Sequence, residues 1–239
     1  MKKTIITSLL MIFMIFCFTS CKDTTDEPVS KTNDSKYTKH YYEVLERLYS
    51  IIKEPSKITD LQENEAGIIE ISNNFVDNAL ENIGYAFLDL NNDKVPELII
   101  GSSNPDFYAH VNNEVYAVYG LKNNIPSQII EGGHRNIYSI TKDNKLFNYT
   151  STSAMHTSFG SYNISPALNV ECEHYYFTHQ KEDDISQIGY FHNKIGEIDK
   201  RLSEELNIRP EAFWKIEQDY ADSTISIDFT PFSEHDSRS

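Results

Sequence analysis

Hydrophobic and polar residues follow two different periods along this chain. Between residues 37 and 53, apolar side chains recur every three or four positions and polar ones fill the other face, which predicts an amphipathic helix ended by Pro55. A weaker pattern predicts a helix over residues 73–81. From Tyr85 onward, short apolar runs separated by Asn, Gly and Asp clusters replace this period, and such runs indicate strands joined by tight turns.

The predicted strands follow one another at close intervals. They cover residues 85–89, 97–100, 115–120, 127–131, 136–141, 145–150 and 158–164. Residues 168–173 alternate most regularly, and Leu168, Val170 and Cys172 are expected to face inward, as in an antiparallel strand with one solvated face.

The chain then returns to helix and closes on a strand. Helices are predicted over residues 203–206 and 210–220, with Trp214 in the core, and a last strand over residues 224–230. The sum is an α+β fold, an antiparallel meander flanked by N- and C-terminal helices, in a single domain over residues 37–239.

The first twenty residues have the pattern of an export signal. Lys2 and Lys3 precede an apolar run over residues 4–18 that is too short to span a bilayer. Small residues then lead to Cys21, an arrangement that resembles the lipobox of bacterial lipoproteins. The resemblance implies that the signal peptide, residues 1–20, is removed and that Cys21 carries lipid on the extracytoplasmic face of a bacterial cell membrane. An ordinary secreted protein cut nearby is the alternative.

The segment after Cys21 is expected to be a tether. Residues 22–35 are polar or charged apart from Val29 and Pro28, so the stretch 21–36 cannot bury enough apolar surface to fold. Loss of the signal removes two lysines and no acids, so the net charge falls from −15 to −17. An acidic surface argues against nucleic acid and favours cations, a basic protein partner or an envelope component.

One loop between two predicted strands carries metal-ligand chemistry. In the run Asp89-Leu-Asn-Asn-Asp-Lys-Val-Pro-Glu97, oxygen-bearing side chains occupy alternate positions at Asp89, Asn91 and Asp93, followed by the carbonyl of Val95 and the carboxylate of Glu97. Calcium needs several converging oxygens of this kind. The alternative is a hairpin whose Asn and Asp residues serve only as turn formers.

The loop resembles the nine-residue calcium loop of integrin-type propeller repeats, D-x-D-x-D-G-x-x-D. The resemblance implies a Ca²⁺ bound by the five residues named above. Two departures imply weak binding: Lys94 replaces the Gly that permits a positive φ, and Asn91 replaces an aspartate. The wider segment over residues 84–101 resembles uncharacterised lipoproteins of clostridia-like bacteria, with the pattern YALYDIDGDGxPELLIG, for which no activity is assigned.

Other candidate chemistry is less specific. Cys172 and His174 stand two apart, with His179 further on, which suits either a zinc site or a buried thiol that acts as a small hydrophobe. No catalytic constellation is visible, so we expect a surface-anchored, non-catalytic binding module. Two alternatives are a cell-envelope hydrolase that uses His134 or His156, and an immunity or inhibitor lipoprotein that masks a basic partner.

Overall fold

The structure is a computed structural model that describes residues 35–75, 77–103, 113–153, 156–181 and 186–235. The expected signal peptide, Cys21 and all but the last two residues of the expected tether lie outside these ranges. In the part of the chain that the structure describes, no helix is long and apolar enough to span a membrane.

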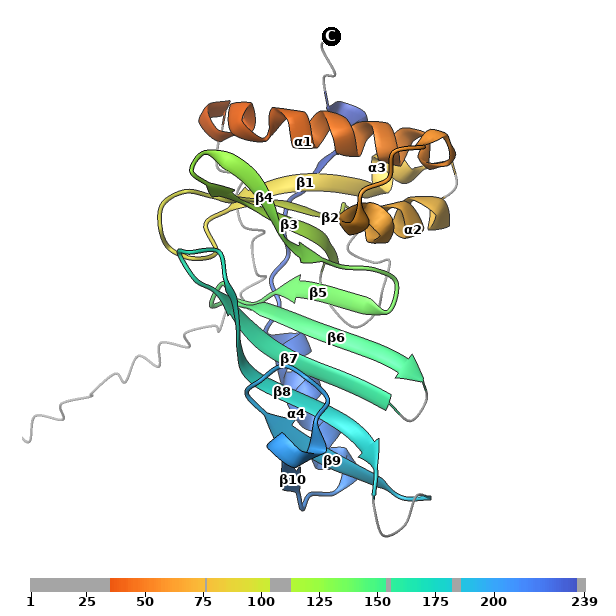
Figure 1. Cartoon of the computed structure of the whole chain (residues 1–239), viewed down its shortest axis with the longest axis vertical. Helices are drawn as coiled ribbons and strands as arrows, with labels where there is room; N and C mark the ends of the chain where they lie inside the picture. Colours follow the sequence, from red (N-terminus) through yellow and green to blue (C-terminus); the bar gives the residue numbers. More distant parts are fainter. Residues whose placement is uncertain (1–34, 76, 104–112, 154–155, 182–185, 236–239) are drawn as a thin grey trace, which may run out of the picture.

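A single antiparallel sheet organises the described residues (Figure 1). Its strand order is β10-β9-β8-β7-β6-β5-β3-β2-β1-β11, with β4 paired to β3 off this path. The strands are β1 Ile83–Leu88, β2 Glu97–Ser102, β3 Val115–Lys122, β4 Ile125–Glu131, β5 Asn136–Ile140, β6 Leu146–Ser153, β7 His156–Ile164, β8 Val170–Gln180, β9 Ile188–Asn193, β10 Glu204–Leu206 and β11 Thr230–Pro231. The predicted α+β meander is therefore confirmed.

Helices lie at both ends of the chain, as predicted. At one end of the sheet are α1 (Ser35–Lys53), α2 (Ala66–Asn74) and α3 (Ala79–Asn82), and α4 (Pro210–Asp222) runs behind β7–β9 (Figure 1). Short 3₁₀ turns cover Pro55–Lys57, Glu63–Glu65, Lys200–Leu202 and Phe232–Glu234.

Three element predictions were wrong. The helix expected over 73–81 is replaced by α2 and α3, because a capping box between Gln62 and Glu65 starts helical structure earlier. Residues 204–206 form strand β10 rather than a helix, since they pair with β9. Of the strand predicted over 224–230, only Thr230 pairs with β1, as the first residue of β11. Helix α1 begins at Ser35, so the last two residues of the expected tether are helical.

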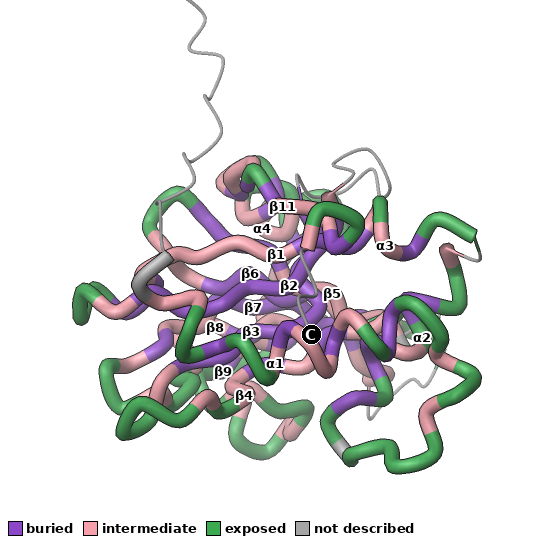
Figure 2. The backbone as a smooth tube through the Cα atoms, turned by 90° about the horizontal axis from the view of Figure 1, so that it is seen from above, coloured by how far each residue is buried: buried purple, intermediate pink, exposed green. Residues whose placement is uncertain are grey.

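Separate hydrophobic clusters hold the helices on the sheet. The stripe of α1, including Tyr41, Leu45 and Leu48, is buried against Leu98 and Ile100 of β2. On α4, Phe213 is fully buried against the strands that carry Phe147 and Phe159, whereas Trp214 is 40% exposed, so the core position predicted for Trp214 is wrong. Figure 2 shows the buried residues concentrated along the strands and the exposed ones in the outer loops and helix faces.

A β-bulge changes the orientation of side chains at the start of β8. Ser161 pairs with His174 and Tyr162 pairs with Cys172, so Glu173 is the extra residue. Cys172 packs with Tyr162, Tyr175 and Phe177, whereas His174 stacks on Tyr176. The alternation expected over 168–173 is therefore broken, and Val170 is exposed.

Candidate functional site

The acidic loop connects β1 to β2 and is closed by its own hydrogen bonds. The Asp89 carboxylate accepts from the backbone N–H of Asp93 at 3.1 Å and from that of Lys94 at 2.9 Å. Asp93 in turn accepts from the N–H of Val95 at 2.7 Å. These bonds fold the two aspartates back over the loop, so the turn is fixed by the side chains that were predicted to bind an ion.

Glu97 is the buried member of the set. Its side chain is 1% exposed and accepts from the N–H of Leu90 at 2.8 Å and from Nδ2 of Asn91 at 2.9 Å. The pKa of Glu97 is raised to about 7, mainly by burial and also by the charges of Asp93 and Asp89, against the lowering by the Leu90 N–H. A buried carboxylate beside two others is costly to ionise.

The backbone of the loop matches one feature of the calcium pattern. Lys94 adopts a left-handed conformation with φ of 70°, the conformation for which the pattern uses Gly, and Asn92 has φ of 60°. Helix α1 braces this turn, because the Tyr37 hydroxyl donates to the Lys94 carbonyl and the Tyr41 hydroxyl donates to the Pro96 carbonyl, each at 3.1 Å.

The predicted ligands are neighbours but are not gathered around one point. Asn91 uses its amide group on Glu97 and its Oδ1 on the Asp93 N–H. Among the described residues, no three His, Cys, Asp or Glu side chains are placed so that together they could hold an ion. Each carboxylate oxygen keeps a second lone pair, so these hydrogen bonds do not exhaust the loop as an acceptor. Calcium binding here stays a prediction.

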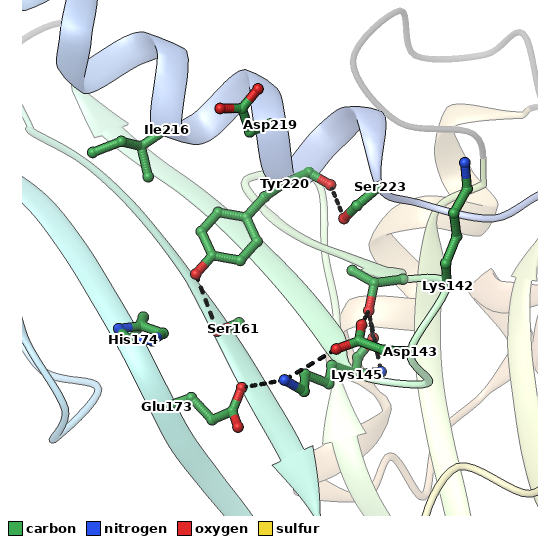
Figure 3. A pocket seen from close by; sticks show the side chains of 11 residues that line it. Lys142, Asp143, Lys145, Ser161, Glu173, His174, Ile216, Asp219, Tyr220 and Ser223 are labelled. Atoms are coloured by element: carbon green, nitrogen blue, oxygen red, sulfur yellow. Dashed lines mark hydrogen bonds and ion pairs between the residues drawn. The ribbon is translucent and has the colours of Figure 1, made fainter.

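A second feature is a groove of about 700 Å³ between α4 and the sheet (Figure 3). Lys145 lies at one side between Glu173, at 2.8 Å, and Asp143, at 3.0 Å. From α4, the Tyr220 ring points toward Ser161, whose hydroxyl is 3.5 Å from that of Tyr220. Opposite charges and one aromatic ring thus share this groove.

The structure brings together two histidines that the sequence pattern did not pair. Nδ1 of His174, on β8, lies 3.1 Å from Nε2 of His192, on β9. The zinc set considered from the sequence, which included Cys172 and His179, is not assembled, because the bulge sends Cys172 to the other face. No local signal could have paired His174 with His192, since strand pairing alone decides it.

The histidines suggested for a hydrolase lie near the β6–β7 hairpin. His156 Nδ1 is 3.0 Å from the Ser153 hydroxyl, a contact between residues three apart in the chain. His134 lines a small pocket that Ser153 also lines. These contacts place a serine hydroxyl beside a histidine, and the hydrolase alternative stays a prediction.

Searches of protein-family models, curated proteins and solved structures found no match to this chain. The resemblances drawn from the acidic loop and from the lipobox thus stay predictions.

Proposed function

We propose that this chain is a lipid-anchored, non-catalytic binding module whose β1–β2 loop binds Ca²⁺. The observation that carries the proposal is the buried Glu97 carboxylate beside Asp89 and Asp93. Carboxylates that share a site repel one another when they ionise, and a divalent cation removes that repulsion. Oxygen-only ligands suit calcium better than softer metals.

Binding requires only local rearrangement. Asn91 must release the Glu97 oxygen that it now contacts, which leaves Asp89, Asn91, Asp93, Glu97 and the Val95 carbonyl as ligands. The backbone is already turned, with Lys94 in the left-handed region and α1 bonded to both Lys94 and Pro96. A pre-formed turn reduces the ordering cost of ligand binding.

Thermal unfolding with calcium tests the proposal. At about 2 mM free Ca²⁺ and a Kd of about 0.3 mM, native-state binding adds about 1.2 kcal/mol to the free energy of unfolding. The melting temperature should then rise by about 2–5 °C, and Mg²⁺ should raise it less because Mg²⁺ keeps its water.

Two variants make the test specific to the loop. Asp89→Asn keeps one oxygen to accept one of the two loop N–H bonds, replaces the other oxygen with an NH2 group and removes a charge, so it should abolish most of the calcium shift. Asp143→Asn is the matched control, since Asp143 lies in a different hairpin turn, and it should leave the shift unchanged. An unmoved melting curve in wild type, or an equal shift in Asp89→Asn, would show that the loop is only a hairpin turn.

The anchor is proposed from the lipobox alone. Cys21→Ala should move the protein from the membrane fraction to the medium or leave it unprocessed. The lipid-anchor proposal would be wrong if the wild-type protein were recovered in the aqueous phase and cut at another residue. That outcome would not affect the calcium proposal.

A further inference from the structure

Two partly exposed imidazoles meet on the face of the sheet that α4 covers. His174 lines the groove beneath α4, and His192 lies on the next strand. Their ring centroids are 5.3 Å apart with planes inclined by 28°, and Nδ1 of His174 is 3.1 Å from Nε2 of His192. This pair takes no part in the proposed calcium loop.

Strand pairing fixes this arrangement. Tyr176 on β8 is the direct partner of His192 on β9, and His174, two residues before Tyr176, is the diagonal neighbour on the same face. The Tyr176 ring packs against His192 with centroids 4.7 Å apart, and it also stacks on His174. The two imidazoles are therefore held by β-sheet backbone and by a shared aromatic neighbour, rather than by a flexible loop.

We propose that His174 Nδ1 and His192 Nε2 form a binding site for a divalent late transition metal ion. Two nitrogens that each lie about 2.1 Å from one ion, with an angle of roughly 90–110° between them, are roughly 3.0–3.4 Å apart. The observed separation falls within this span. One nitrogen now donates a proton to the other. When the ion binds, that proton moves through solvent to the other nitrogen of its own ring, and both rings rotate so that their two facing lone pairs point at the ion.

Two charged side chains act on His192 in opposite senses, and the larger effect is that of the carboxylate. Glu204 on β10 is the direct cross-strand partner of His192, and its exposed carboxylate attracts positive charge, while Lys194 acts in the opposite sense. Within the described ranges no third His, Cys, Asp or Glu completes a ligand group. The remaining coordination positions are therefore left for water or for a donor atom of a ligand.

The ligand type selects the metal. Imidazole nitrogen suits Cu²⁺, Ni²⁺ and Zn²⁺, with affinity rising from Ni²⁺ to Cu²⁺ and lower again for Zn²⁺. Calcium prefers oxygen. The histidine pair and the acidic loop are thus expected to bind different ions without competition.

Calorimetric titration with NiCl₂ tests the site, on the full chain without a histidine tag. Wild type should bind one ion per chain at this site. His174→Gln and His192→Gln should each weaken binding at least about tenfold, because removal of a group that only orients a metal ligand already causes a loss of that size. His179→Gln is the matched control, because His179 lies on the same strand but its Nδ1 faces the Gln180 carbonyl, and it should bind as wild type does.

A second measurement needs no variant. Nickel should broaden the ring signals of His174 and His192 in nitrogen-detected NMR spectra before those of the other six histidines. Unchanged affinity in His192→Gln, an equal loss in His179→Gln, or first broadening at another histidine would each overturn the proposed site.

Discussion

The acidic loop and the histidine pair are both clusters of metal-ligating side chains, but they are assembled in different ways. The loop draws its groups from consecutive residues between β1 and β2, so its pattern is visible in the sequence. The pair draws His174 and His192 from two strands, and only the register of β8 with β9 brings them together. A ligand set encoded locally can be read from spacing, whereas one encoded by sheet register cannot.

The two regions also differ in what supports them. Helix α1 braces the loop through Tyr37 and Tyr41, while α4 packs above the groove next to the histidine pair. The β5–β6 turn links them, because Nδ2 of Asn144 donates a long bond of 3.4 Å to the Asp89 carbonyl, and neighbouring Asp143 and Lys145 line the groove. Because this link is one long hydrogen bond, we expect that damage to one region leaves the ion response of the other intact.

Removal of the main α4 anchor is the strongest test of that independence. Phe213 is fully buried, with ring centroids 5.1 Å from Phe159 and 4.6 Å from Tyr190. Phe213→Ala should lower the free energy of unfolding by about 3–5 kcal/mol, measured by urea denaturation. The calcium shift in melting temperature should persist, because α1 rather than α4 holds the loop. A calcium shift that disappears along with α4 packing would show that the regions act as one.

The second test uses pH, because the pKa values of two buried carboxylates are raised. Burial raises the pKa of Glu97 and of Glu114 to about 7 from an ordinary 4.5. The folded state therefore keeps protons that the unfolded state releases. The contribution of these two groups to the free energy of unfolding should be highest below about pH 4.5. It should fall as the pH rises to about 7, by roughly 2–3 kcal/mol for each carboxylate.

Variants separate the two carboxylates. Without calcium, Glu114→Gln should remove one part of the fall in stability between pH 5 and pH 7.5 and leave the calcium response unchanged. In wild type, calcium should reduce the part that belongs to Glu97, which denaturation curves with and without the ion would report. If Glu114→Gln also abolished the calcium response, the loop would not be the origin of that response.

Much of the fold could be predicted from the sequence because it depends on local periods. The stripe of α1 and the run of β-hairpins gave the correct class, and Pro210 marked the start of α4. Two of the failures are nonlocal: β10 forms because residues 204–206 meet β9, and the bulge at Glu173 turns Cys172 away from His174. Of the site, the resemblance to the calcium loop pointed to a left-handed residue at position 94, but the burial of Glu97 at the start of β2 could not be predicted from the sequence.

The smallest expected effect concerns Lys94, where the acidic loop departs most from its pattern. A non-glycine residue in the left-handed region costs about 1–2 kcal/mol, and the greater unfolded-state freedom of Gly returns part of that. Lys94→Gly should therefore raise the free energy of unfolding by about 0.5–1 kcal/mol, and loss of the lysine charge should also tighten calcium binding. Asn123→Gly, at φ of 54° in the β3–β4 turn, is the matched control and should gain less, because Asn tolerates this conformation. Equal calcium affinity in Lys94→Gly and wild type would mean that position 94 does not face an ion.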